Sequence, residues 1–285
     1  MPHFLAALKR FYLPLFLLVL SASLFFGIKS QNLDMASEIL FYSPFILCSV
    51  SYLLCLAMGK LDWSIGAIVV FAGIAQLTST FETNNLYCGY LAGLLAGMIL
   101  GAINGWMVGI LKWPSLLATL GSMLVLNYIN QFFLQQKKMS LVMEYYLKSH
   151  PHELALPCVF LIGGLIFLLI IIKTTKLKLY AMAIGEDHVQ ALRFSENPKV
   201  IIVLVYIIQG MTAGLSGACL VAIEPMRVYV TYETLPLLVL AAGLLGGMRL
   251  KGGGRPSLIK LFYAIGIVLC ILTWGRHGIQ LFLRP

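Results

Sequence analysis

Hydrophobic residues run along this chain in long stretches that are separated by short polar connections. A helix that crosses a lipid bilayer needs roughly 20 largely apolar residues. The pattern predicts nine such helices, at 11–28, 39–59, 63–80, 87–111, 114–134, 154–172, 200–222, 234–248 and 257–275. The stretch at 234–248 is short, so we expect it to be tilted, partly re-entrant or one half of a broken helix.

The fourth stretch has glycine at every fourth position. These glycines are Gly89, Gly93, Gly97, Gly101, Gly105 and Gly109. In lipid, this spacing lets helix backbones approach closely. A four-residue step overshoots the 3.6-residue turn by about 40°, so the row winds about 200° around its helix. We therefore expect this helix to lie centrally in a bundle, with different partners at different depths. Gly93, Gly97, Gly101 and Gly105 are the expected packing residues.

Composition gives the same fold class. Hydrophobic residues make up 60% of the chain, charged residues 11%, and the mean hydropathy is +0.92. These values exclude an ordinary soluble domain. We expect an all-α, polytopic helical bundle in a membrane with about nine to ten spans, forming a single transmembrane domain over residues 1–285.

The basic residues predict the orientation of the bundle. With the N-terminus in the cytoplasm, 13 lysines and arginines fall on the inside and 7 on the outside, as the positive-inside rule requires. This distribution explains the net charge of +9 without a nucleic-acid partner. The six cysteines form no CxxC pair, and His150-Pro151-His152-Glu153 lacks a third clear ligand, so we expect neither disulfides nor a metal site.

Two inside loops carry recognisable patterns. The loop from Lys173 to Lys199 has a short helical pattern over 181–194, interrupted by Gly185, which fits either a solvated connector or a docking helix for a cytoplasmic partner. The loop at 248–256 is glycine-rich and basic but lacks the GxxxxGK[ST] order of a phosphate-binding loop. We expect a tight, positively charged turn there.

Polar residues inside the apolar stretches are few and almost all uncharged. Asp62 starts the third span, either as a helix cap or as a buried acid that faces a pathway. The uncharged ones include Asn104, Thr119, Ser122, Asn127, Asn130, Gln131 and Gln209. They fit either hydrogen bonds between helices or the lining of a hydrophilic pathway. Because this line has no charge, a neutral polar solute fits better than a proton relay.

Four segments, taken together, resemble one family across residues 40–275. They are LDWSIG at 61–66; GAING at 101–105 with WPSLLATLGSM at 113–123; AIGED at 183–187 with Ala191; and LGG at 245–247 with GGG at 252–254. They are similar to the I-D-L-S-V-G, G-x-x-N-G, P-x-F-I-A-T-L-G-T-M, A-I-G-G-N-x-x-A-A-R-x-S-G and L-G-G-T-x-L-x-G-G-x-G elements of ribose-type permease subunits of bacterial ABC importers.

The resemblance implies a transport subunit without catalytic activity in the bacterial inner membrane. Its partners would be a cytoplasmic ATPase that binds ATP and magnesium, a second permease subunit of the same or a different chain, and an extracytoplasmic solute-binding protein. Family substrates are mainly simple sugars, including furanose forms, and autoinducer-2. The expected pathway residues are Asp62, Ser64, Asn104, Thr119, Ser122 and Asn127, and the expected ATPase-docking residues are Gly185, Glu186, Asp187 and Ala191.

The sequence also departs from the family pattern. Glu186-Asp187 replaces glycine and asparagine, which favours a dedicated ATPase, and Pro236 is expected to break the eighth span. The family has one more apolar span after residue 275, which favours pairing with a different permease subunit. Three alternatives stay open: a permease for nucleosides or branched-chain amino acids, a self-contained secondary transporter, and an intramembrane enzyme.

Overall fold

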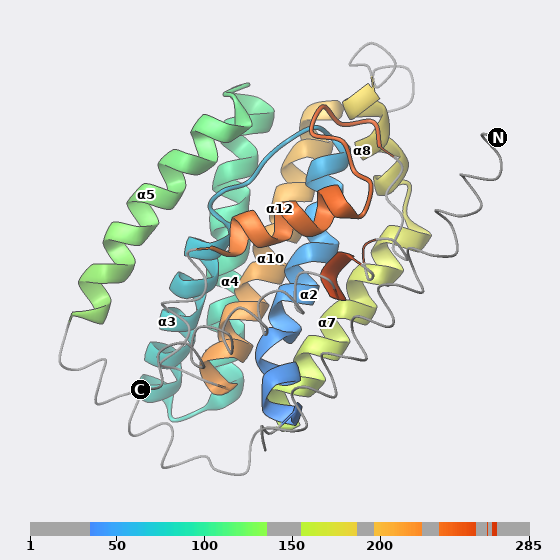
Figure 1. Cartoon of the computed structure of the whole chain (residues 1–285). Helices are drawn as coiled ribbons and strands as arrows, with labels where there is room; N and C mark the ends of the chain where they lie inside the picture. The colour runs from blue at the N-terminus through green and yellow to red at the C-terminus, as the bar shows by residue number, and fades with distance from the viewer. Residues whose placement is uncertain are drawn as a thin grey trace, which may run out of the picture.

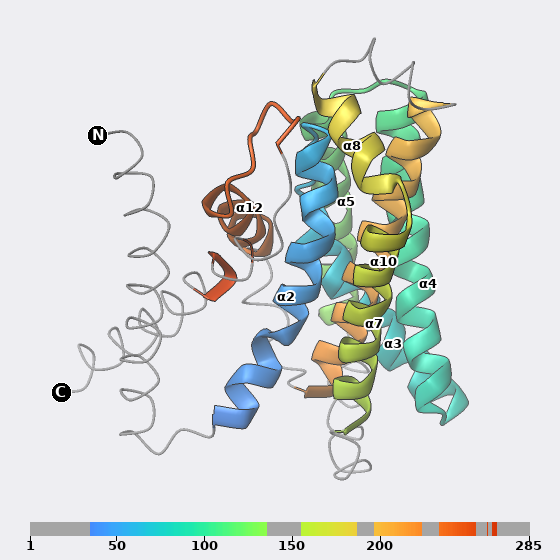
Figure 2. The same cartoon turned by 90° about the vertical axis from the view of Figure 1, so that its right-hand side faces the viewer.

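The computed structural model describes residues 35–135, 155–186, 197–223 and 234–254, together with Leu261 and residues 264–266. The helices in these ranges, in chain order, are α2 (Met35–Ala57), α3 (Ile65–Thr83), α4 (Leu86–Gly105), the π-helical turn η1 (Trp106–Ile110), α5 (Ser115–Leu134), α7 (Ala155–Thr174), α8 (Leu177–Glu186), α10 (Pro198–Ile223) and α12 (Leu235–Leu245). The long helices run side by side as a bundle, as Figure 1 and Figure 2 show. The expected all-α fold is confirmed for this part of the chain.

Five of the described helices are long and apolar enough to cross a membrane. They are 65–83, 86–110, 115–134, 156–174 and 198–222, and a shorter apolar helical segment covers 44–57 of α2. Each agrees within a few residues with a stretch expected from the hydrophobic pattern. The expected spans at 11–28 and, for the most part, 257–275 lie outside the described residues, so the total of nine to ten spans stays a prediction.

Helix α12 is the exception to the parallel arrangement. It is only 11 residues long, lies across the bundle in Figure 1, and contacts α2 and α3. Pro236 stands in its first turn, where the helix needs no backbone N–H donor, so this proline starts α12 and does not break it. The expectation that 234–248 differs from a simple span is therefore confirmed, while the expected break at Pro236 is wrong.

Helix α10 is the central packing element of the described bundle, because it contacts α2, α3, α4, α7, α8 and η1. Three polar rungs join it to α2. Ser51 pairs with Thr212 at 2.7 Å between their hydroxyl oxygens, Cys48 donates to the Ser216 hydroxyl at 3.4 Å, and Cys55 donates to Gln209 Oε1. On each helix the three residues recur at i, i+3 and i+7, so both polar stripes face each other along an antiparallel pair.

The glycine row packs α4 against two helices. A methyl group added at Gly89 would meet Gln76 and Thr80 of α3, and one added at Gly93 would meet both α3 and α10. From Gly97 to Gly109 the row faces α10 alone. The expected change of partner with depth is confirmed. The π-helical turn η1 has more residues per turn than an α-helix, so each of its residues rotates the chain by a smaller angle. This smaller rotation keeps Gly109 facing α10.

The expected central position of α4 is wrong for the described bundle. Only the glycine face is covered; the opposite face carries large exposed apolar side chains. These are Tyr87, Leu91, Leu95, Ile99, Ile103, Trp106 and Ile110. The glycines lie on one face of α4 only. They allow α4 to approach α10 closely on that face, and they do not require other helices to cover the remaining faces of α4.

Basic side chains gather at one end of the bundle. Among the described residues, the lysines and arginines are Lys60, Lys112, Lys173, Lys176, Lys178, Lys199, Arg249 and Lys251. They lie in or beside the connections α2–α3, η1–α5, α7–α10 and the turn after α12, all at the upper end in Figure 1. The positive-inside rule assigns this basic end to the cytoplasm.

Candidate functional site

The connector at residues 58–64, between α2 and α3, is the structural base of the candidate site. Its backbone is held by side chains of two other helices. Ser115 and Thr119 of α5 accept the backbone N–H groups of Leu61 and Trp63 at 3.2 and 3.1 Å. The Tyr206 hydroxyl of α10 donates to the Leu61 carbonyl oxygen at 3.3 Å. The connector is therefore fixed relative to α5 and α10.

Asp62 is buried in this connector, with 2% of its surface exposed. Its Oδ1 accepts the backbone N–H of Ser64 at 2.8 Å and the Ser64 hydroxyl at 2.6 Å. Its own N–H donates to the Tyr52 hydroxyl at 3.2 Å. Asp62 is thus a buried acid that pairs the backbone N–H of Ser64 directly before α3. It does not cap α3, because Ser64 is the N-cap residue and no side chain in the described part of the chain bonds to the N–H groups of the first turn, so the helix-cap interpretation is wrong.

The ionisation of Asp62 follows from this position. Asp62 lies in the connector, outside the spanning helices. Burial raises the pKa of its carboxyl from 3.8 to about 6. The two hydrogen bonds from Ser64 lower this pKa but do not cancel the effect of burial. At neutral pH the carboxylate is therefore mostly ionised. As an acceptor it orients the Ser64 hydroxyl, whose oxygen is left free to accept a further hydrogen bond.

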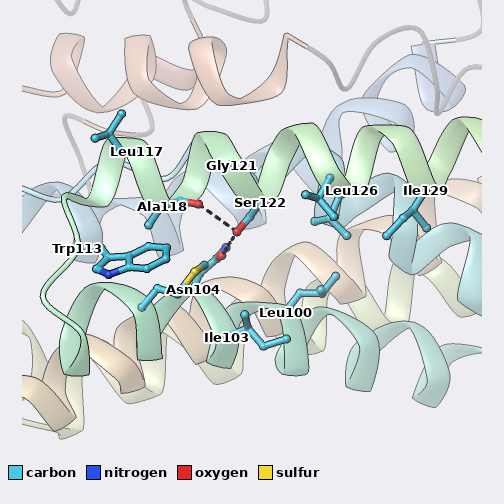
Figure 3. Close-up of a pocket in the computed structure, with 12 residues that line it drawn as sticks. Leu100, Ile103, Asn104, Trp113, Leu117, Ala118, Gly121, Ser122, Leu126 and Ile129 are labelled. Atoms are coloured by element: carbon cyan, nitrogen blue, oxygen red, sulfur yellow. Dashed lines mark hydrogen bonds between the residues drawn. The ribbon is translucent and has the colours of Figure 1, made fainter.

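That further bond starts a chain that joins the connector to α4 and α5. Asn104 of α4 donates through Nδ2 to the Ser64 hydroxyl oxygen at 2.7 Å, and Ser122 of α5 donates to Asn104 Oδ1 at 2.6 Å. Asn104 uses one of its two N–H donors and one of its two Oδ1 lone pairs in these bonds. Figure 3 shows Asn104 and Ser122 pointing toward each other across the space between α4 and α5.

A groove of about 410 Å³ lies over this pair, between α4 and α5. Its lining residues are Leu100, Ile103, Asn104, Met107, Trp113, Leu117, Ala118, Gly121, Ser122, Val125, Leu126 and Ile129. Most of these side chains are apolar, and Asn104 and Ser122 supply the uncharged polar groups at its floor. Its size and its apolar lining with few polar groups are typical of a site for a small molecule.

The six expected pathway residues take different places around the groove. Asn104 and Ser122 line it, while Ser64 and Asp62 lie behind them in the hydrogen-bonded chain. Thr119 is fully buried and holds the connector. Asn127 is half-buried on α5 and is not among the residues that line the groove.

Sequence reasoning missed the residues that hold the connector. Tyr52, Ser115 and Tyr206 all bond to its backbone. Ser115 belongs to a recognised element of the sequence, but tyrosines are common in apolar stretches and give no signal of their own. Asn130, noted in the sequence as polar, donates to the Ala67 carbonyl oxygen at 3.1 Å and so joins α5 to α3.

The expected docking residues lie partly within the described chain. Helix α8 begins at Leu177, earlier than the expected 181, and Gly185 is its second-last residue. The remainder of the expected helical pattern, from 187 to 194, lies outside the described residues. A side chain at Gly185 would collide with the Ala57 carbonyl, so close packing on the end of α2 explains this glycine. Glu186 is exposed at the end of α8. Asp187 and Ala191 lie outside the described residues.

Comparison with known proteins identifies the family. Residues 35–269 match the family described as the branched-chain amino acid transport system / permease component. The chain belongs to this permease family. As a permease it is a transport subunit and not an enzyme, in a transporter whose ATPase lies on a separate subunit, and it resides in the bacterial inner membrane.

Similar proteins include several sugar permeases, which confirms the resemblance to ribose-type permeases. The permease is 27% identical to the L-arabinose transport system permease protein AraH of Escherichia coli K12, over 81% of this chain and 70% of that protein. Identity is 25% to the galactofuranose transporter permease protein YtfT of the same strain, with coverage of 78% and 67%. It is also 25% to the fructose import permease protein FruF of Bifidobacterium longum, with coverage of 73% and 61%. No solved structure matches.

Proposed function

We propose that this permease carries a neutral monosaccharide, and that Asn104 and Ser122 provide hydrogen-bonding groups along its pathway. Asp62 and Ser64 act behind them by orienting Asn104. The observation that carries this proposal is the uncharged hydrogen-bonded chain from Ser64 through Asn104 to Ser122 at the floor of the groove.

The chemistry of the groove suits a sugar better than an amino acid. A zwitterionic amino acid would need a charged partner once it leaves water, and the groove lining contains no ionisable side chain. Asp62 is shielded behind Ser64 and is 2% exposed. A sugar needs uncharged donors and acceptors together with apolar surface, which is what the lining of the groove supplies. The relatives named for L-arabinose, galactofuranose and fructose support the same class.

The exposed surfaces support a proposal for the assembly. The outer faces of α4 and α5 are apolar beside the groove, with Ile99, Ile103, Leu117 and Val125 exposed. We propose that a second permease subunit, of the same or a different chain, covers this side and closes the pathway. A cytoplasmic ATPase would dock at the basic end on the segment that contains Gly185, Glu186, Asp187 and Ala191. A solute-binding protein would deliver the sugar at the opposite end.

Uptake by the complete transporter tests the solute class. Radiolabelled L-arabinose, D-ribose, D-galactose, D-fructose and L-leucine would be offered to cells that express the full transporter. We expect energy-dependent uptake of at least one sugar and none of leucine. Uptake of leucine alone would overturn the proposal, and uptake that follows an ion gradient without ATP would favour a secondary transporter.

A variant pair links the uptake to the groove. Ser122→Ala removes the hydroxyl that donates to Asn104. It should lower sugar uptake, because the Asn104 amide at the floor of the groove is then no longer held in its orientation. Thr174→Ala is the matched control: the Thr174 hydroxyl donates to the carbonyl four residues before it, as Ser122 also does, but it is exposed and far from the groove. Equal uptake by both variants would contradict the assignment of the groove.

A further inference from the structure

Two turns and the end of helix α8, which are far apart in the sequence, meet at the basic end of the bundle through glycines. A side-chain carbon at Gly59 would lie 2.7 Å from the Lys251 carbonyl oxygen, and one at Gly252 would lie 2.7 Å from both the Gly185 Cα and the Gly59 backbone nitrogen. Each of the three glycines therefore leaves space that a neighbouring backbone occupies. We call the meeting of Gly59, Gly185, Gly252 and Gly253 the glycine junction.

The backbone of the junction requires glycine for a second reason. Gly59, Gly252 and Gly253 have φ angles of +67°, +86° and +71°, in the left-handed region that other residues rarely adopt. The Gly253 N–H donates to the Ala57 carbonyl oxygen at 2.9 Å, which joins the turn after α12 to the end of α2. The junction is thus a tight contact of three backbones, with one hydrogen bond between two of them.

The junction fixes an exposed turn beside the expected docking helix. Leu250 is 51% exposed at the tip of this turn, between the exposed cations Arg249 and Lys251. Glu186, at the end of α8, packs on Gly253. Figure 1 shows the chain after α12 running past α8 and the end of α2. A half-exposed leucine between two cations, held at a fixed distance from α8, is a surface suited to a rigid protein partner.

We propose that the turn at 249–251 is a second contact of the ATPase, which binds it together with the end of α8. The complementary surface is an apolar hollow for Leu250 with an acidic rim for Arg249 and Lys251. This proposal rests on the proposed docking of the ATPase on α8. Anionic lipid headgroups would also attract the cations, but lipid contact needs no fixed spacing between this turn and α8, whereas one rigid partner that touches both does.

The position of the junction gives this second contact a mechanical role. Gly59 starts the connector whose other end holds Asp62 and Ser64, and through them Asn104. A displacement of the turn by the ATPase would press directly on the backbone of Gly59. The path from the ATPase to the floor of the groove would then run through the turn, the backbone of the connector from Gly59 to Asp62, and the hydrogen bonds that link Asp62, Ser64 and Asn104.

Site-specific photo-crosslinking tests the second contact. A photoreactive phenylalanine analogue would replace Leu250, Glu186 or, as control, Val159, which is 66% exposed near the other end of the bundle. The full transporter is irradiated in its native membrane. The adducts are then searched by mass spectrometry for peptides of the co-purifying subunit that carries the GxxxxGK[ST] motif. We expect this ATPase at Leu250 and Glu186 but not at Val159.

The other outcomes separate the two proposals. An ATPase adduct at Glu186 with only lipid at Leu250 overturns the second contact and leaves the docking on α8 in place. No ATPase adduct at either position overturns both. An equal ATPase adduct at Val159 overturns the second contact, because the label at Leu250 would then report no specific proximity.

A glycine pair tests whether the junction positions the turn. Gly252→Ala places a methyl group against the backbones of Gly185 and Gly59, whereas Gly163→Ala on α7 meets nothing within 4 Å. With both variants present in the membrane at normal amounts, we expect the Leu250 crosslink to fall about tenfold in Gly252→Ala, as a weakening of about 1.4 kcal/mol would produce. The Glu186 crosslink should persist. An unchanged Leu250 crosslink would overturn the role of the junction.

Discussion

Gly97 of α4 and Gly210 of α10 exclude each other's side chains. A side-chain carbon at Gly97 would fall on the Gly210 carbonyl oxygen, and one at Gly210 would fall on the Gly97 carbonyl oxygen. The contact is reciprocal, so the two helices approach as closely as their backbones allow. In lipid, where hydrophobic burial does not drive helices together, such close contact is a main source of helix association.

Substitution in this seam should therefore destabilise the bundle. We expect Gly97→Ala to lower the free energy of unfolding by about 2 kcal/mol, because the added methyl group forces α4 and α10 apart. The thermal midpoint in mild detergent measures this effect, with Gly163→Ala as the control in open space. Similar midpoints for the two variants would show that the seam carries no special packing.

A larger side chain at the same seam should abolish transport. Gly101→Leu would push into the Tyr206 carbonyl and the Gly210 backbone of α10. Since Tyr206 also holds the connector through Leu61, this collision should disturb the site as well as the packing. Sugar uptake by cells that display the variant in their membrane is the measurement. Normal uptake would refute the packing argument.

The hydrogen bond between Asn104 and Ser122 should appear as an energetic coupling. We expect a double-mutant cycle of Asn104→Ala and Ser122→Ala to give about 0.5–1.5 kcal/mol of interaction free energy, typical of one hydrogen bond. Unfolding of the purified permease, measured for the parent, the two single variants and the double variant, provides the cycle. Strictly additive losses would show that the two side chains act independently.

Asp62 predicts a particular dependence of stability on pH. Burial raises the pKa of its carboxyl from 3.8 to about 6, so the folded state binds the proton more tightly than the unfolded state. The stabilisation by this proton is complete below pH 3.8 and is lost as the pH rises through about 6. At 1.36 kcal/mol per unit it amounts to about 3 kcal/mol.

The variant Asp62→Asn keeps an acceptor oxygen for Ser64 but cannot ionise. As the pH rises from about 4 to 7, the thermal midpoint of the parent should therefore fall relative to that of this variant. Midpoints recorded over this range check the sign. Parallel curves for parent and variant would mean that the carboxyl is not buried in the folded chain.

Charge at the end of α8 should matter for assembly. Glu186 is exposed, and Asp187 follows it in the sequence. We expect reversal of both residues to lysine to reduce the amount of ATPase that co-purifies with the tagged permease, because the docking surface would present the opposite charge. Unchanged co-purification would show that the docking segment is assigned wrongly. As a control, the amount of the variant permease in the membrane is measured, so that a loss of the permease itself is not taken for a loss of ATPase binding.

The periodic features of the sequence predicted the fold best. Apolar stretches set the positions of α3, α4, α5, α7 and α10 to within a few residues, since length and hydropathy suffice for a spanning helix. The spacing of the glycines predicted close packing and a change of partner along α4. It did not reveal that the partner from Gly97 onward is α10, because spacing on one helix contains no information about which helix lies opposite.

The site was harder to predict than the fold. Asn104 and Ser122 stand out because polar residues are rare in apolar stretches, and the structure joins them to Ser64. Thr119 stands out equally, yet its hydroxyl binds the connector backbone. The polarity of a side chain shows that it needs a partner in lipid, but it does not show whether that partner is backbone, another side chain or solute.

The glycine junction limits how this protein can change over generations. When a bulky side chain disturbs an ordinary core, a smaller neighbour can restore the fit. At Gly59, Gly185 and Gly252 the neighbours are already glycine or bare backbone. No second-site replacement can make room there, so a genetic screen for suppressors of Gly252→Ala should return true revertants.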